Sequence, residues 1–92
     1  MNGWTRTNKV ITKKYSTKDW GSSSSFFYFI SKLAELCDHH PVIEIRYDSI
    51  KIELGSHESR TVTRLDIEMA KYIDQYFEQH KERLGKNEKE KK

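Results

Sequence analysis

The block His39-His40-Pro41 constrains this chain more than any other feature of the sequence. Proline lacks a backbone N–H and disfavours a helical conformation in the residue before it, so a helix that runs toward this block must end there. Two alternating runs of apolar and polar residues follow, at 43–47 and 50–54, with Asp48-Ser49 between them as a two-residue turn. This pattern predicts a β-hairpin, whose far end returns beside its start. We therefore expect His57, just after the hairpin, to lie near His39 and His40.

Composition indicates a small protein with one modest core. The chain has 92 residues, and we expect one domain at 1–85 followed by a disordered charged tail at 86–92, which holds no apolar residue. Hydrophobic residues make up only 35% of the sequence, so self-association would bury apolar area that a single copy exposes. No run of about 18 apolar residues occurs, which argues against a membrane span. With Cys37 as its single cysteine, the chain forms no internal disulfide, and we expect a cytoplasmic protein with the nucleus as a second compartment.

Basic side chains are concentrated at the N-terminus. Residues 1–18 carry five of them and no acidic side chain, whereas acidic side chains outnumber basic ones in residues 19–85. The domain as a whole is therefore not basic, which argues against nucleic-acid binding as the main function. A first hairpin is predicted in residues 4–17 with its turn at Asn8-Lys9, and its Trp4 and Tyr15 would suit stacking on single-stranded nucleic acid. We favour the simpler interpretation, in which one face of this hairpin covers the core.

Two helical patterns alternate with the two predicted hairpins. Asp19 is a good N-cap for the first helix, which should run to His39. Thr63 and Asp66 have the spacing of a capping box for a second helix, which should fray near Gly85. The apolar stripe of the first helix is Phe26, Phe29, Ile30, Leu33, Leu36 and Cys37, and that of the second is Leu65, Met69, Tyr72, Ile73, Tyr76 and Phe77. The order of elements is therefore ββα-ββα.

Three histidines near one another suggest either a metal site or acid–base chemistry. Adjacent residues such as His39 and His40 project about 100° apart on a helix, whereas zinc ligands usually share one face, so a metal is the weaker interpretation. A nucleophilic role for Cys37 is weaker still, because its thiol falls on the apolar side of the helix. Glu35 lies one helical turn before His39, and Asp38 is adjacent to it. Carboxylates there can accept a ring N–H and fix the tautomer, which favours acid–base catalysis over a simple charged helix terminus.

The spacing of these residues resembles the signature of pterin-4a-carbinolamine dehydratases, also known as dimerisation cofactors of a homeodomain transcription factor. The matching positions are Glu35, His39, His40, Pro41, Tyr47, His57 and Asp66, and the similarity covers nearly the whole chain. The resemblance implies an α+β fold in which a four-stranded antiparallel sheet is backed by two long helices, with subunits joined into homodimers or homotetramers. The family commonly has a helix before its first strand, and we expect this chain to lack it. Ile43 stands where the family often has a tryptophan.

The resemblance also implies a reaction on a small-molecule pterin. It is the loss of water from 4a-hydroxytetrahydropterin to give quinonoid dihydropterin, which recycles tetrahydrobiopterin without a metal or a cofactor. The roles that it implies are catalysis by His39, His40 and His57, binding of the pterin by His40, Ser56 and Glu58, and orientation of the imidazoles by Glu35 and Asp38.

Asp66 belongs to the same signature, but its distance from Thr63 has a local explanation. We interpret Asp66 as a helix cap rather than a site residue, because a carboxylate at the third helical position can accept the N–H of the N-cap residue. The alternative to an enzyme is a non-catalytic interaction module that stabilises a transcription-factor dimer.

Overall fold

The computed structural model describes residues 3–55 and 61–86, and its elements follow the predicted order. The elements are β1 (Thr5–Arg6), β2 (Val10–Ser16), α1 (Trp20–Cys37), β3 (Val42–Arg46), β4 (Ser49–Gly55), α2 (Arg64–Gln79) and the short α3 (Lys81–Leu84). The predicted ββα-ββα order and the α+β class are confirmed. None of the helices in these two ranges is long and apolar enough to cross a membrane.

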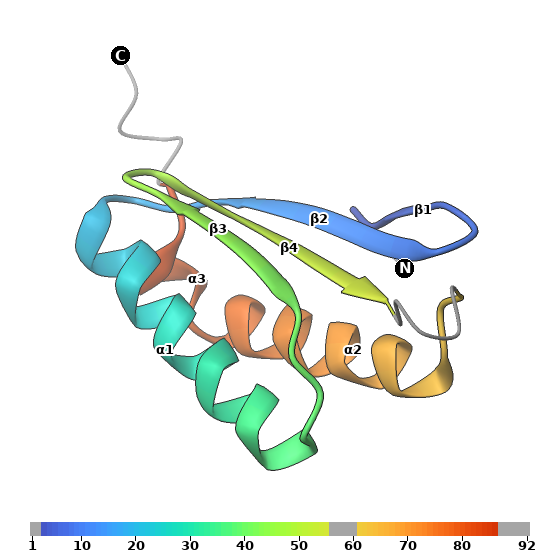
Figure 1. Ribbon diagram of the computed structural model, residues 1–92. Coiled ribbons are helices and arrows are strands. Elements are labelled where there is room, and N and C mark those ends of the chain that lie inside the picture. The colour runs from blue at the N-terminus through green and yellow to red at the C-terminus, as the bar shows by residue number, and fades with distance from the viewer. Residues whose placement is uncertain (1–2, 56–60, 87–92) are drawn as a thin grey trace.

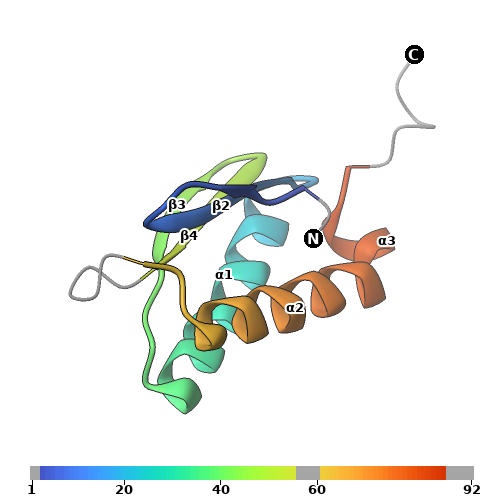
Figure 2. The ribbon, with the colours of Figure 1, turned by 90° about the vertical axis from the view of Figure 1, so that its right-hand side faces the viewer.

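The four strands form one antiparallel sheet in the order β1-β2-β4-β3. Strand β4 lies between β2 and β3 and joins the two hairpins, because it pairs with β3 of its own hairpin and with β2 of the first one. Both long helices lie on the same face of this sheet, and the other face carries no helix (Figure 1). Figure 2 shows the sheet and the helices as two layers. The predicted sheet backed by two helices is therefore confirmed.

The turn of the second hairpin lies one residue earlier than predicted. Arg46 pairs with Ser49, so the turn is Tyr47-Asp48, and the prediction of Asp48-Ser49 was wrong. The predicted turn and the observed turn give two different strand registers. Both registers place the same isoleucines on the helix-covered face, so the alternation of apolar and polar residues cannot distinguish the two turns. The turn is held by contacts from elsewhere in the chain. The Thr17 N–H donates to the Asp48 carbonyl over 3.0 Å, and the Ser23 hydroxyl donates to the Tyr47 carbonyl over 3.2 Å.

Helix α1 begins where the sequence predicted, although four serines follow its start. Asp19 is the N-cap, and its side chain accepts the Ser22 N–H over 2.9 Å. Serine has a poor helix propensity, but the hydroxyls of Ser22 and Ser23 have partners. The Ser23 and Thr17 hydroxyls lie 2.6 Å apart, and the Ser22 hydroxyl donates to the Arg83 carbonyl. Tertiary hydrogen bonds therefore hold the first turn of α1 against the sheet and α3.

Only part of each predicted apolar stripe is buried. The fully buried residues include Phe26 and Ile30 of α1, and Met69 and Ile73 of α2. Three stripe members instead face solvent: Leu36 is 85% exposed, Tyr72 55% and Leu65 40%. Leu65 and Tyr72 each precede a fully buried residue by one position, which places them about 100° around the helix from the core. The stripes are therefore narrower than predicted.

The end of the second helix also differs from the expected fraying. Helix α2 ends at Gln79, and the chain then turns through α3 and returns to the sheet, where Gly85 forms a bridge with Thr17. Leu84 is fully buried at this point, which explains why the segment packs against the core. Lys86, the expected first residue of the tail, forms an ion pair with Asp48 over 3.2 Å, and the rest of that tail lies outside the described residues.

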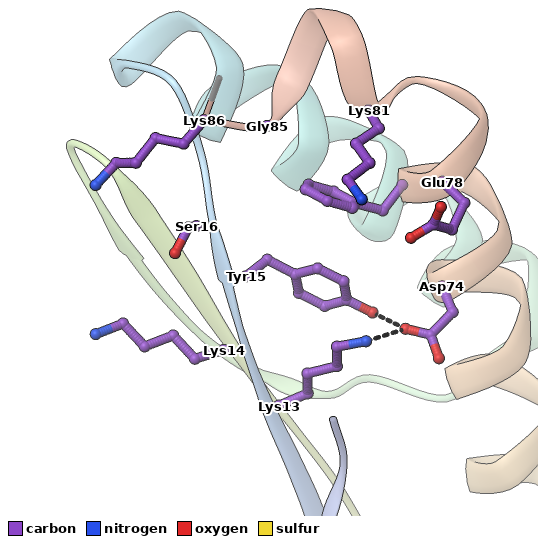
Figure 3. Close-up of a pocket in the computed structure, with 10 residues that line it drawn as sticks. Lys13, Lys14, Tyr15, Ser16, Asp74, Glu78, Lys81, Gly85 and Lys86 are labelled. Atoms are coloured by element: carbon purple, nitrogen blue, oxygen red, sulfur yellow. Dashed lines mark hydrogen bonds and ion pairs between the residues drawn. The ribbon is translucent and has the colours of Figure 1, made fainter. Parts of the chain in front are cut away.

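The first hairpin is joined to α2 by a polar cluster around Asp74. Its carboxylate accepts hydrogen bonds from the Lys13 ammonium over 2.8 Å and from the Tyr15 hydroxyl (Figure 3). It also accepts one from the Trp4 ring N–H over 2.9 Å. Tyr15 is buried, and this burial together with the Asp74 carboxylate raises the pKa of its hydroxyl. The ring of Tyr15 packs edge-on against Phe26 in the core. The interpretation that this hairpin covers the core is confirmed for Tyr15.

Removing the Asp74 carboxylate should destabilise the protein. In Asp74→Ala, three donors lose their acceptor, and we expect the free energy of unfolding to fall by about 1–3 kcal/mol. Urea denaturation followed by circular dichroism measures this change. The control is Asp48→Ala, whose exposed ion pair with Lys86 is screened by water and should contribute far less to stability. Equal losses in the two variants would show that the Asp74 cluster is not a structural anchor.

Candidate functional site

The site is built where α1 ends. Asp38 is the C-cap in the left-handed conformation with φ 51°, and the next N–H, that of His39, donates to the Ala34 carbonyl over 3.0 Å. The chain therefore leaves the helix before the histidines, so the prediction that this helix runs to His39 was wrong, and Pro41 prevents the helix from resuming. The Asp38 side chain makes no hydrogen bond to a described residue. Its expected role in orienting the imidazoles stays a prediction. In the structure, Asp38 forms the left-handed turn that ends α1.

The two imidazoles contact different elements. His39 Nε2 is hydrogen-bonded to a carboxylate oxygen of Asp66, near the start of α2. His40 Nε2 lies 2.9 Å from a carboxylate oxygen of Glu35, on the last turns of α1. We expected Glu35 to lie against His39, one turn along the same helix. Because Asp38 leaves the helical conformation, Glu35 instead lies against His40.

Asp66 has two sets of contacts. Its Oδ2 accepts the Thr63 N–H over 2.8 Å and the Thr63 hydroxyl over 3.1 Å, which confirms the predicted capping box at the start of α2. Its Oδ1 is the partner of His39. The sequence analysis found the cap and missed the imidazole contact. The available signal was that a cap occupies one carboxylate oxygen and leaves the second oxygen able to accept a hydrogen bond from another residue.

Burial separates the two carboxylate–imidazole pairs. The side chain of Asp66 is fully buried and that of His39 is 20% exposed, whereas those of Glu35 and His40 are 74% and 57% exposed. Water and salt screen the Glu35–His40 pair, so it adds little to stability. Around the Asp66–His39 pair the dielectric response is weaker, so that hydrogen bond fixes the ring more firmly.

His57, Ser56 and Glu58 lie in the range 56–60, outside the described residues. The structure does describe the chain on both sides of them. Glu53 pairs with Val42, so the end of β4 returns beside the start of β3, as the hairpin pattern predicted. The position of His57 relative to His39 stays a prediction.

The chemistry that the described side chains offer is proton transfer. An imidazole backed by a carboxylate is a common general acid or base near neutral pH. In the ranges 3–55 and 61–86, no group of three His, Cys, Asp or Glu side chains is arranged to hold a metal ion. The cavity in Figure 3 is a different place, since it lies between β2 and the last turns of α2 and is lined by Tyr15, Asp74 and Phe77.

Comparison with known proteins agrees with this fold. A family model described as pterin 4 alpha carbinolamine dehydratase matches residues 1–76. Proteins of Aquifex aeolicus (strain VF5) and Koribacter versatilis (strain Ellin345) share the name "Putative pterin-4-alpha-carbinolamine dehydratase". The first is 36% identical over 75 residues, which are 82% of this chain and 76% of that protein. The second is 37% identical over 70 residues, which are 76% and 74% of the two chains.

Solved structures are similar as well. A crystal structure of a transcriptional coactivator/pterin dehydratase from Brucella Melitensis has a TM-score of 0.77 at 30% identity and covers 82% of each chain. A pterin dehydratase-like protein described as a RuBisCO assembly factor of the alpha-carboxysome has a TM-score of 0.65 at 15% identity, with 78% of this chain and 83% of that one covered, and is similar in fold alone. The family expected from the signature is confirmed by the sequence matches. The chain belongs to the pterin-4a-carbinolamine dehydratase family.

Proposed function

We propose that this protein is a 4a-hydroxytetrahydropterin dehydratase that works by histidine acid–base catalysis. The observation that carries the proposal is the imidazole of His39, held by the buried Asp66 in a chain of this family. The product would be a quinonoid dihydropterin, so the enzyme would recycle tetrahydrobiopterin. The reaction needs no electron transfer and therefore no redox cofactor.

Two proton transfers account for the reaction. The hydroxyl on C4a must receive a proton to leave as water, and N5 must lose one, so one protonated and one neutral imidazole are sufficient. Histidine is the side-chain type whose charge changes near neutral pH, so a pair of histidines can supply both forms. We assign the transfers to His39 and His57. His40, with Ser56 and Glu58, would bind the pterin, and Glu35 would orient His40.

Alanine variants of the histidines test this proposal. His39→Ala or His57→Ala should lower the turnover number by about 10² to 10⁴, because each removes one proton-transfer group. His40→Ala should raise KM more than it lowers turnover, since a binding residue acts on the ground and transition states alike. Dehydration of synthetic 4a-hydroxytetrahydropterin, measured with and without a chelator, gives these rates.

The matched control for those variants is the fourth histidine. His80 caps the end of α2 and lies against the Tyr76 ring with a centroid distance of 4.2 Å, so His80→Ala should leave turnover unchanged. The uncatalysed dehydration proceeds on its own, so each rate is compared with a blank that contains no enzyme. If the intact protein does not exceed this blank, the enzymatic proposal fails.

An exposed apolar strip on the helices supports self-association. Phe29 of α1 and Tyr76 of α2 are stacked at 3.8 Å between ring centroids. Leu36 lies seven residues after Phe29, and Tyr72 lies four before Tyr76, so both continue the sides of the helices on which this stack lies. Leu36, Leu65 and Tyr72 are exposed, and together they form what we call the outer strip. Exposed apolar strips of this kind are typical of protein–protein contacts, and we propose a homodimer or homotetramer that buries this one.

The same strip supports the alternative function, an interaction module that stabilises a transcription-factor dimer. The Brucella relative is described as a transcriptional coactivator as well as a pterin dehydratase. A partner helix would bury the outer strip in the same way as the proposed second copy. Activity above the blank separates this alternative from the enzymatic proposal.

A charge placed in the outer strip should prevent self-association. Leu36→Glu should shift the protein toward the monomer in sedimentation velocity at micromolar concentration, because an unpaired charge in an apolar contact is strongly unfavourable. The control is Asn8→Glu, which adds the same charge at an exposed turn. A wild-type protein that is already a stable monomer would contradict the proposal.

A further inference from the structure

We infer that Asp66 is the positioning residue of His39, and that it holds the imidazole in the Nε2–H tautomer so that Nδ1 faces the pterin. The inference rests on the proposed function and adds to it the reacting atom and the residue that selects it. It also changes the role of Asp66 from a helix cap to a cap and a catalytic support together.

The hydrogen bonds of Asp66 define the direction of its contact with His39. Its Oδ2 faces the Thr63 N–H at 2.8 Å, and a backbone N–H can only donate. The Thr63 hydroxyl is a second donor to the same oxygen. A carboxylate in its ionised form has only acceptor sites, so we take Oδ1 as an acceptor like Oδ2. The His39 Nε2 therefore carries the proton in this hydrogen bond.

The tautomer of His39 follows from this bond. A neutral imidazole has one N–H, so a proton on Nε2 leaves Nδ1 with a lone pair. His39 would then take up or deliver the catalytic proton at Nδ1, while Nε2 stays bound to Asp66. When Nδ1 takes a proton, the nearby carboxylate stabilises the positive charge of the ring, so the proton is transferred without a rearrangement of the site.

Glu35 provides an internal comparison, because it makes the same kind of contact without the burial. It faces His40 Nε2 at 2.9 Å, but both side chains are more than half exposed. Water can replace either partner of this pair, so the tautomer of His40 is not fixed by it. Asp66 is fully buried and cannot exchange its partner for bulk water. Removal of Asp66 should therefore affect proton transfer far more than removal of Glu35.

The capping role of Asp66 can be separated from the positioning role. Thr63→Ala removes the hydroxyl that donates to Oδ2 and weakens the start of α2, but it leaves the contact between Oδ1 and His39. Asp66→Asn keeps the size of the side chain and presents an amide N–H₂ that can donate to His39, which favours the opposite tautomer. The first variant perturbs the cap alone, and the second perturbs both roles.

The experiment combines kinetics with the ring nitrogens of His39. In Asp66→Asn we expect the turnover number to fall by about 10- to 100-fold with a smaller change in KM, which is typical of losing the partner that orients a functional imidazole. Thr63→Ala should stay within about threefold of the wild type. The ¹⁵N NMR spectrum, recorded without substrate and assigned through His39→Ala, should show the Nε2–H tautomer in the wild type and in Thr63→Ala, and its loss in Asp66→Asn.

Two results would overturn the inference. One is an unchanged His39 tautomer in Asp66→Asn, and the other is a fall in turnover in Thr63→Ala as large as that in Asp66→Asn at a matched melting temperature. The NMR measurement also distinguishes this inference from the proposed function. If the wild type fails to exceed the blank while the tautomer still depends on Asp66, the dehydratase proposal fails and the positioning of His39 stands.

Discussion

The pairing of β2 with β4 is the interaction on which the rest of this fold depends. Seven residue pairs join the two hairpins, from Val10 with Gly55 to Ser16 with Ser49. A two-stranded hairpin alone is marginally stable in water, so neither hairpin could hold a helix by itself. Joined, they present one face on which Ile50, Ile52 and Leu54 are fully buried. Both helices pack on this face, and their relative position follows from it.

The site is a consequence of that packing. Helix α1 ends close to where α2 begins, which brings His39 and Asp66 together from positions 27 residues apart in the sequence. A buried carboxylate without partners would be strongly unfavourable, so the fold must give Asp66 its hydrogen bonds. Thr63 supplies two donors to Oδ2, and His39 is the partner of Oδ1. The groups that stabilise the start of α2 and the group proposed to move protons are therefore parts of one network.

The sequence predicted the elements and their order because those depend on local rules. Asp19 and Thr63 mark the helix starts, Pro41 marks the residue before which α1 must end, and the alternation in residues 43–54 marks the second hairpin. It did not predict the position of the hairpin turn, because two registers of that hairpin bury the same side chains. The structure selects one register through hydrogen bonds to Tyr47 and Asp48, which come from residues outside the hairpin.

The sequence predicted which side chains gather near the end of α1 better than it predicted which of them contact one another. Helical spacing pairs Glu35 with His39, but that spacing holds only while the chain is helical, and Asp38 has already left the helix. The contact between His39 and Asp66 needs the relative position of two helices, which no local pattern contains. The exposure of Leu36, Leu65 and Tyr72 was missed for a related reason. Periodicity shows that a helix has an apolar side, but the width of the buried part depends on the surface against which it packs.

The two carboxylate–imidazole pairs differ in a way that suits two different tasks. An exposed pair such as Glu35 with His40 can open to admit a ligand, because water replaces the broken contact at little cost in free energy. The pair of Asp66 with His39 is shielded, so its geometry is kept through a change of charge on the ring. Ligand binding benefits from the first property and proton transfer from the second. Adjacent residues in the sequence thus lie in different environments, because the left-handed turn at Asp38 sends one imidazole toward the buried start of α2 and leaves the other largely in solvent.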